Sequence, residues 1–399
     1  MSGDLSLLPG RLLRRAGPPK PVEEFQGVQI DDPRLADILP PGAKLLCLYE
    51  GTLHGEGPVW EPARNRLVWS DVPNRRLLAW HPDGHVTVAI DGTYFMNGNA
   101  LEADGKLVHC EHGRRCISRS DGDGDPAPII THFQGKRLNS PNDVTVAGDD
   151  TIWFTDPTFG LLMPNQGSLV EPELDHRSVY RFDPRDGTLR RMADFEQPNG
   201  LAFAPDGRTL YVSDTSLSLN EIPGDQTGTH HKIEAFDVAP DGTLANRRFF
   251  CHTDHGYPDG FKVDPRGWMW TTAADGITST RPTAPGSATS RHQPYVRTAR
   301  LAARECGACS WRRPTCCWRS TSWAELRRGR YGSASTETPP RFASTVSSAP
   351  WSARVKPSAT LALPTWVSCS SSRSTPSGKI GRHAVTDLPK PSTINPASR

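Results

Sequence analysis

Apolar residues in this chain come in short runs that alternate with polar residues or are rich in β-branched and aromatic side chains, which is typical of β-strands. Five stretches share one pattern, in which a polar and a small residue open an apolar run and a turn leads into a second run. The turns carry Asp-Gly or a related pair, as at Asp104-Gly105 and Asp206-Gly207, and such pairs favour tight hairpins. The stretches open at Glu56, Asn99, Asn142, Asn199 and Asp259.

The five opening residues follow one another at steps of 43, 43, 57 and 60 residues. A unit that repeats at this period, with longer loops in the later copies, is typical of a blade repeated around an axis. We therefore expect an all-β chain folded as a β-propeller, of which about four and a half blades are recognisable. In a propeller the first strand of each blade lines the central channel, so the opening residues are expected to converge on the axis.

The regions before and after the repeats divide the chain into three parts. We expect a flexible N-terminal segment over residues 1–21, the propeller domain over residues 22–277 and a separate tail over residues 278–399. The stretch AKLLCLYEG from Ala43 is a candidate for the strand that closes the ring. The N-terminus lacks the apolar run of a signal peptide, and no stretch is long enough to span a membrane. We therefore expect a cytoplasmic protein with no membrane partner, as a monomer or a weak homo-oligomer.

The tail differs in composition from the rest of the chain. Sixteen Arg and three Lys against four acidic residues give it a net charge of +15, which leaves −13 for residues 1–277. An Arg-, Ser- and Pro-rich arm is typical of nucleic-acid binding, but this one also carries five Trp and five of the nine Cys residues. We therefore interpret it as an irregular tail of low order and expect no nucleic-acid partner.

The excess of Arg over Lys in the tail indicates GC-rich codons translated out of frame. If one C was lost between Ile277 and Thr278, codons permitted for Thr278 to Ser287 re-read in the neighbouring frame as HVYAPDGTRLG. That reading supplies a strand and an Asp-Gly turn where the fifth blade requires them. Codons permitted for Pro294 to Ala303 re-read as VCSNCTFGG, a candidate opening for a sixth inner strand. We predict that the tail is a frameshift product, with a true extension as the alternative.

The residues that open the repeats carry oxygen atoms suited to a divalent cation. Carboxylate and amide oxygens are hard ligands, which calcium and magnesium prefer. Asn and Asp before Gly also serve turn geometry on their own, so it is their recurrence at equivalent positions that indicates a metal site. Asn99 is a candidate for the wall of the substrate pocket, with a purely structural role equally open. Among the histidines, only His112, in the stretch CEHG, is weighed as facing the channel.

Five motifs in chain order resemble the calcium-dependent lactonases of the gluconolactonase, regucalcin (senescence marker protein) and luciferin-regenerating enzyme family. They are GEGPVW, KRLNSPNDV, FTDPTFG, QPNGLAFAPDG and YPDGFKVDPRG, within a match from about Val22 to Ile277. The resemblance implies a six-bladed propeller with one divalent cation on its axis, calcium first, with zinc, magnesium or manganese as alternatives. The chain departs from the family in having no recognisable sixth blade after Ile277.

The resemblance also implies roles for single residues. Glu56, Asn199 and Asp259 fall on the metal ligands of the family, and Asn142 falls on a residue that contacts the metal or the substrate. Arg137, ahead of Asn142 in the same loop, resembles the substrate-binding arginine of the family, with a solvated loop charge as the alternative.

These features predict a metal-dependent hydrolase that opens small sugar-acid lactones. A divalent ion polarises a bound carbonyl and lowers the pKa of a coordinated water, so that attack by water becomes feasible near neutral pH. Asp259 is the candidate to accept the proton of that water, while Arg137, Asn142 and Asn99 are candidates to hold the substrate. The alternatives are an organophosphate or aryl-ester hydrolase on the same site, a non-catalytic calcium- or ligand-binding propeller, and an inactive product of a frameshifted gene.

Overall fold

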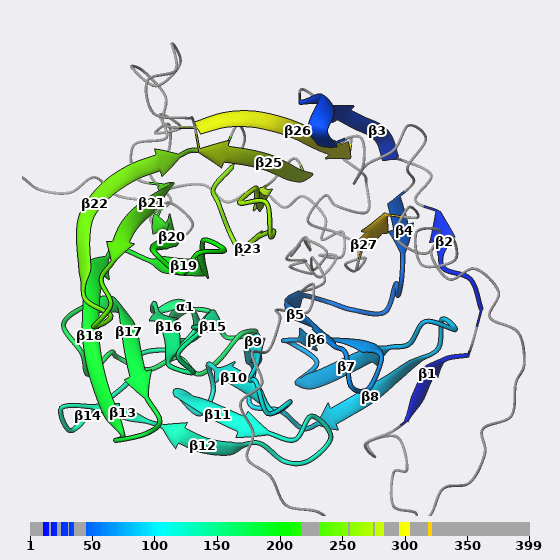
Figure 1. The fold of residues 1–399 in the computed structure, drawn as a ribbon. Helices are drawn as coiled ribbons and strands as arrows, with labels where there is room; N and C mark the ends of the chain where they lie inside the picture. Colours follow the sequence, from blue (N-terminus) through cyan, green and yellow to red (C-terminus); the bar gives the residue numbers. More distant parts are fainter. Residues whose placement is uncertain are drawn as a thin grey trace, which may run out of the picture.

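The computed structural model describes residues 11–15, 17–21, 25–30, 32–35, 45–216, 231–253, 256–273, 276–282, 295–303 and 318–320. Within these ranges the regular structure is almost entirely β-strand, in antiparallel sheets that follow one another around a ring (Figure 1). The helices that lie wholly within the ranges are the single turns η2 (Pro33–Leu35) and α1 (Phe159–Leu162), and neither could cross a membrane. The prediction of an all-β, propeller-like chain is confirmed.

Each of the first three blades is a meander that starts at the centre of the ring and runs outward. The first blade consists of β5 (Gly55–Glu61), β6 (Arg66–Asp71), β7 (Arg76–Trp80) and β8 (Val86–Asp91), with β1 (Leu12–Arg14) paired to β8. The second consists of β9 (Met96–Leu101), β10 (Leu107–Glu111), β11 (Cys116–Ser120) and β12 (Ala127–Ile130). The third consists of β15 (Val144–Val146), β16 (Ile152–Asp156), β17 (Arg177–Asp183) and β18 (Thr188–Phe195).

Two further blades and two small sheets complete the described fold. The fourth blade consists of β19 (Pro198–Phe203), β20 (Thr209–Thr215), β21 (His231–Val238) and β22 (Leu244–Cys251). The fifth consists of β23 (Phe261–Val263), β24 (Met269–Ala273), β25 (Gly276–Pro282), β26 (Tyr295–Ala303) and β3 (Phe25–Ile30). The small sheets are the hairpin of β13 (His132–Phe133) with β14 (Lys136–Arg137), and the sheet of β2 (Lys20–Pro21), β4 (Leu45–Cys47) and β27 (Trp318–Ser320).

The fifth blade corrects the expectation that regular structure is lost after Ile277. Ile277 lies inside β25, and β25 pairs along its length with β26, so the blade has its outer strands and four and a half blades is an undercount. The physical reason is local: Thr278 and Thr280 are short, β-branched side chains that fit a buried pleated surface, and both are buried. The rest of the predicted low-order tail, apart from β26 and β27, lies outside the described residues, as do residues 1–10 of the predicted flexible segment.

The sheet of β2, β4 and β27 occupies the sector between the fifth and first blades (Figure 1). It includes Leu45–Cys47, the part of the expected ring-closing stretch that the structure assigns to a strand. A three-stranded sheet with one short strand from the tail is not a regular blade like the other five. The described residues therefore form five blades, and the sixth blade that the family resemblance implies stays a prediction.

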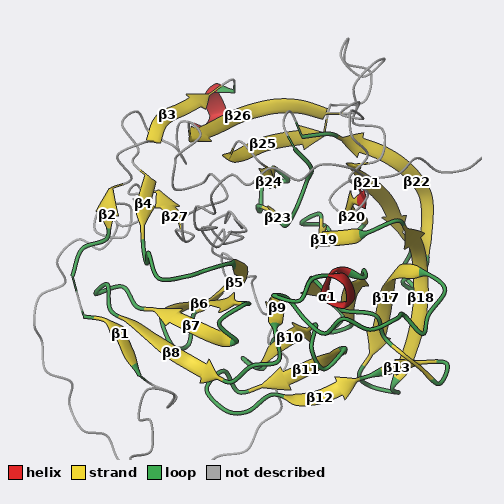
Figure 2. Cartoon of the chain, turned by 180° about the vertical axis from the view of Figure 1, so that it is seen from behind, coloured by secondary structure: helices red, strands yellow, loops and turns green. Residues whose placement is uncertain are grey.

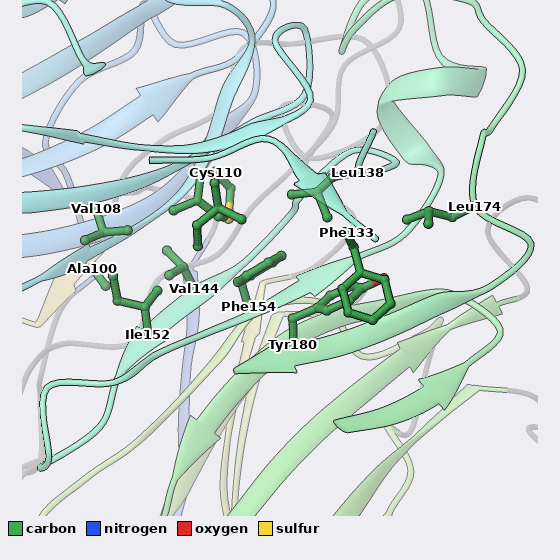
Figure 3. Packing of buried hydrophobic residues seen from close by; sticks show 12 residues of the cluster. Ala100, Val108, Cys110, Phe133, Leu138, Val144, Ile152, Phe154, Leu174 and Tyr180 are labelled. Atoms are coloured by element: carbon green, nitrogen blue, oxygen red, sulfur yellow. The ribbon is translucent and has the colours of Figure 1, made fainter. Parts of the chain in front are cut away.

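The hydrophobic core lies between adjacent blades, because alternate residues of each strand face opposite neighbours. Figure 3 shows the layer between the second and third blades, where side chains from β9, β10 and β11 pack on those from β15, β16 and β17. Phe154 and Tyr180 stack there with ring centroids 5.2 Å apart, and Phe133 meets Tyr180 edge-on at 5.1 Å. These layers hold the inner strands in fixed positions around the axis.

Candidate active site

The four residues expected to bind a metal lie at the starts of inner strands in four different blades. Glu56 is the second residue of β5 and Asn199 the second residue of β19. Asn142 and Asp259 each stand two positions before their strands, β15 and β23. The inner strands surround the centre of the ring, as Figure 2 shows from behind.

Three hydroxyl groups link the inner strands of neighbouring blades. Each belongs to the second strand of one blade and donates a hydrogen bond to a backbone carbonyl near the start of the next inner strand. The bonds run from Ser70 Oγ to Asn97 O at 2.7 Å, from Thr155 Oγ1 to Asn199 O at 2.7 Å and from Ser213 Oγ to Asp259 O at 3.0 Å. The main chain of two candidate ligand residues is therefore held by the preceding blade.

The residue after each of these hydroxyls is a buried aspartate that holds the loop leading into its own inner strand. Each carboxylate accepts a hydrogen bond from the backbone N–H of a residue 17 or 18 positions earlier. The pairs are Asp71 with Leu53 at 3.0 Å, Asp156 with Asn139 at 2.9 Å and Asp214 with Gln197 at 3.1 Å. The residues held in this way come shortly before Glu56, Asn142 and Asn199, so these carboxylates fix where the candidate ligands stand.

Close approach of the inner strands requires glycine at two positions. A Cβ atom on Gly98 would lie 2.5 Å from the backbone oxygen of Asn142, and one on Gly200 would lie 2.7 Å from the backbone oxygen of Asp259. The N–H of Gly98 instead donates to that oxygen of Asn142 at 2.8 Å. A larger residue at either position would push the inner strands apart, and with them the candidate ligands.

Asp143, next to the candidate ligand Asn142, is a buried carboxyl group whose pKa is shifted upward. Burial raises the pKa of Asp143, and the carboxylate of Asp259 raises it further, whereas the ammonium of Lys262 opposes the shift. Asp143 precedes the inner strand of the third blade, whereas Asp259 and Lys262 belong to the inner end of the fifth. A negative charge at Asp259 therefore disfavours ionisation of Asp143.

Glu56 is paired with a histidine that the sequence did not single out. Nε2 of His54 lies 2.9 Å from Oε1 of Glu56, and both side chains are largely buried, at 9% and 14% exposed. The backbone N–H of Val72 donates to the carbonyl of His54 at 3.0 Å, which fixes the histidine beside β6. His54 therefore restricts the position of the Glu56 carboxylate. His54 lies in the bend before β5 rather than in the strand, so only its closeness to Glu56 in the sequence could have indicated the pair.

Asn99 lies in a fully buried network between the first two blades. Its Nδ2 donates to the carbonyl of Gly57 at 2.8 Å and to Ser70 Oγ at 2.9 Å, and its Oδ1 lies 2.6 Å from Nδ1 of His109. Both the nitrogen and the oxygen of the Asn99 amide group therefore have partners inside the protein. This agrees with the purely structural role that the sequence left open for Asn99. A role for Asn99 in the pocket wall stays a prediction.

Arg137 lies in the β13–β14 hairpin, outside the five blades. Its Nη2 donates to the carbonyl of Arg114 at 2.6 Å, and its backbone N–H donates to the Glu173 carboxylate at 2.9 Å. Its Nε is buried and has no hydrogen-bond partner among the described residues. The structure thus places Arg137 in a group of loop contacts, and substrate binding by this residue stays a prediction.

The side chains of the four candidate ligands carry oxygen atoms of the type that a hard divalent cation prefers. Within the part of the chain that the structure describes, no three His, Cys, Asp or Glu side chains form a group that could hold a metal. An ion would therefore depend on amide oxygens as well as carboxylates. Two carboxylates, from Glu56 and Asp259, with two amide oxygens, from Asn142 and Asn199, make an all-oxygen set of the kind that calcium accepts in flexible geometry together with water.

The buried aspartate of the third blade predicts a pH-dependent stability. Burial raises the pKa of Asp156 to about 7, although the N–H of Asn139 and the guanidinium of Arg115 oppose the shift. Between the ordinary pKa of 3.8 and about 7 the folded protein binds more protons than the unfolded chain, so a rise in pH destabilises the fold. Relative to an Asp156→Asn variant, the protein is expected to lose up to ~4 kcal/mol of stability over this window.

Urea unfolding of both proteins at about pH 5 and about pH 8 tests this expectation. The Asn side chain keeps an oxygen that accepts from Asn139, so the variant serves as a neutral control of the same shape. A difference in the free energy of unfolding that does not change between the two pH values would contradict the prediction.

The described strands form a propeller-like ring of antiparallel blades, and residues with oxygen-bearing side chains stand at the starts of its inner strands. A family model described as the SMP-30/Gluconolactonase/LRE-like region matches residues 54–293. This chain belongs to that family. The match runs past Ile277 into the segment that the sequence suggested was out of frame.

Individual relatives cover most of the same part of the chain. A gluconolactonase of Zymomonas mobilis is 29% identical over 263 residues, which are 61% of this chain and 71% of that protein. Regucalcin of Xenopus laevis is 27% identical over 243 residues, 58% of this chain and 73% of that protein. The solved structure of a gluconolactonase from Xanthomonas campestris superposes with a TM-score of 0.65 at 44% identity, covering 74% of this chain and 90% of that one.

Proposed function

We propose that this protein hydrolyses small sugar-acid lactones at the centre of the propeller. The reaction is proposed to use one divalent cation, with calcium as the first candidate, and this cation is proposed to be held by Glu56, Asn142, Asn199 and Asp259. Membership of the family and the names of its relatives, gluconolactonases among them, support lactone hydrolysis. The observation that carries the proposed site is that hydroxyl groups and glycines draw the starts of successive inner strands together. The proposal includes a sixth blade, as the family resemblance implies.

A bound divalent cation supplies polarisation of the lactone carbonyl and a lowered pKa for a coordinated water. Asp259 is the group of this chain proposed to accept the proton of the attacking water. Its backbone is held on both sides, because its N–H donates to Thr272 O at 3.3 Å and its carbonyl accepts from Ser213 at 3.0 Å. A base held in this way stays near the point of attack, and positioning of this kind is a large part of catalytic rate.

Glu56 is proposed to hold charge rather than to move a proton. Its contact with His54 keeps one carboxylate oxygen in a fixed place, which lowers the cost of ordering the site when a cation enters. Asn142 is held by its backbone on both sides, since its N–H donates to Thr155 O at 2.9 Å and its carbonyl accepts from Gly98 at 2.8 Å. The amide side chain of Asn142 is therefore attached to a main chain that is fixed in position.

The test is an assay of glucono-δ-lactone hydrolysis on the full chain, with calcium and with a chelator. We expect calcium-dependent hydrolysis that the chelator reduces to the uncatalysed rate and that added calcium restores. An aryl ester and an organophosphate, assayed in parallel, separate the lactonase from the esterase alternative. Hydrolysis that the chelator leaves unchanged would rule out the proposed metal dependence, and turnover of only the ester or the organophosphate would rule out the lactonase.

A further inference from the structure

We propose that His112 is a substrate-binding residue whose Nε2 accepts a hydrogen bond from a hydroxyl group of the lactone. The inference rests on the proposed function and deepens it, because it assigns the residue that selects hydroxylated lactones. His112 lies outside the five motifs from which the metal ligands and the proton-accepting Asp259 were inferred.

The first observation is that one nitrogen of the ring is engaged and the other is not. The side chain is fully buried, and Nδ1 lies 3.1 Å from the carbonyl oxygen of Gln166. A carbonyl oxygen only accepts, so Nδ1 carries the hydrogen and Nε2 presents a lone pair. Nε2 is buried and has no hydrogen-bond partner among the described residues.

A second buried histidine shows what a purely structural role looks like in this protein. His109, also fully buried, has Nδ1 2.6 Å from Asn99 Oδ1 and Nε2 2.7 Å from Ser120 Oγ. Both of its nitrogens are therefore satisfied inside the fold. Because an unsatisfied buried nitrogen costs free energy, the open Nε2 of His112 calls for a partner that the described residues do not supply.

The position of His112 places that partner beside the axial site. The residue follows β10 directly, in the turn that leads to β11, and its backbone N–H donates to Phe95 O at 3.2 Å just before inner strand β9. A Cβ on Gly160 would lie 2.6 Å from Cβ of His112 and 2.9 Å from Cβ of Ser140, which stands two positions before the candidate ligand Asn142. His112 therefore lies beside the loop that carries Asn142. Burial lowers the pKa of His112 to about 4, so its ring is neutral at pH values well above about 4.

The ring is held rigidly in this position. A Cβ on Gly160, in α1, would lie 2.6 Å from Cβ and 2.7 Å from Cγ of His112, so the helix packs directly on the ring. Figure 2 shows α1 over the third blade, beside the inner strands rather than at the outer edge of the ring. Since Nδ1 is bonded to the loop that follows α1, Nε2 on the other side of the ring is directed away from that loop.

The chemistry of an accepting nitrogen identifies the ligand group. The carbonyl and ring oxygens of a lactone are acceptors and cannot donate to a bare Nε2. The hydroxyl groups of a sugar-acid lactone are donors. A site built to bind a substrate hydroxyl discriminates strongly against an analogue that lacks it, so His112 is expected to favour polyhydroxylated lactones over plain ones.

Two substitutions separate the two ring nitrogens. His112→Asn keeps an amide N–H near the place of Nδ1 and removes the acceptor, whereas His112→Gln places an amide oxygen near the place of Nε2. We expect His112→Asn to lower kcat/KM for glucono-δ-lactone by about 10- to 100-fold and for δ-valerolactone, which has no hydroxyl, by less than about twofold. His112→Gln is expected to recover much of the loss for the hydroxylated substrate.

His109→Gln is the matched control for damage to a buried histidine, and it is expected to affect both lactones alike. Calorimetric binding of gluconate and of valerate gives the same comparison without turnover, with gluconate weakened about tenfold by His112→Asn and valerate unchanged. Equal losses for both substrates, or no loss for either, would overturn the role of His112. A wild-type chain that hydrolyses neither lactone would count against the proposed function, and the gluconate comparison then decides on His112 alone.

Discussion

Replacing Asp259 with alanine is expected to lower kcat/KM for lactone hydrolysis by about three orders of magnitude, because one carboxylate is proposed both to bind the cation and to accept a proton. Loss of a positioned general base alone costs roughly 10²- to 10⁴-fold. The backbone of Asp259 is held through Ser213 and Thr272, so the substitution removes the carboxylate without releasing the strand.

The variant Asp259→Asn separates the two roles, since an amide oxygen can still bind a cation but takes no proton. It is expected to bind calcium, measured by calorimetry, more weakly than the wild type and to stay inactive. Asp206→Asn is the control for the same change of side chain, because Asp206 also precedes a glycine but lies in the exposed turn between β19 and β20, where it accepts from the N–H of Arg208 at 2.9 Å. Full activity in Asp259→Ala would exclude this residue from the mechanism.

The propeller could be predicted because its signal is local and repeated. Each inner strand and each hairpin turn, such as Asp104-Gly105, is encoded within about fifteen residues, and the repeat itself indicates the ring. The same repetition indicated that the opening residues share one region, and the structure draws their strands together.

The contacts that position the site could not be predicted, because they depend on pairings between distant parts of the chain. Asp156 and Asp214 are visible in the sequence only as Thr-Asp and Ser-Asp at the ends of strands. Their partners, Asn139 and Gln197, follow from the way each loop returns to the axis. The open nitrogen of His112 likewise becomes visible only when Gln166 is seen to occupy the other one.

The continuation of β25 past Ile277 could not be predicted for a different reason. The change in composition there indicates an end of structure, but Thr278 and Thr280 are β-branched residues that suit a strand. β25 ends at Pro282, and the re-read sequence HVYAPDG would place a proline at the same position, with Asp-Gly directly after it. The strand is therefore compatible with both readings.

Restoring the reading frame by inserting one C after the codon for Ile277 is expected to give a protein that is more soluble and about a hundredfold more active on lactones. In the described residues a three-stranded sheet, with only Trp318–Ser320 from the tail, stands where a sixth blade would close the ring. An incomplete ring leaves strand edges exposed to other chains and leaves the axial groups less rigidly held, and displacement by about 1 Å costs roughly a hundredfold in rate.

Lactonase activity and soluble yield of both versions, expressed in parallel, measure this difference, and sequencing the gene across the codons for Gly276 to Thr280 tests its cause. Carrying Asp259→Ala in the restored version links any gain to the axial site, because activity that survives this substitution comes from elsewhere. Equal yield and equal rate in the two versions would show that the tail is a true extension. The sheet of β2, β4 and β27 would then be how this propeller closes its ring, with β27 supplied by the tail.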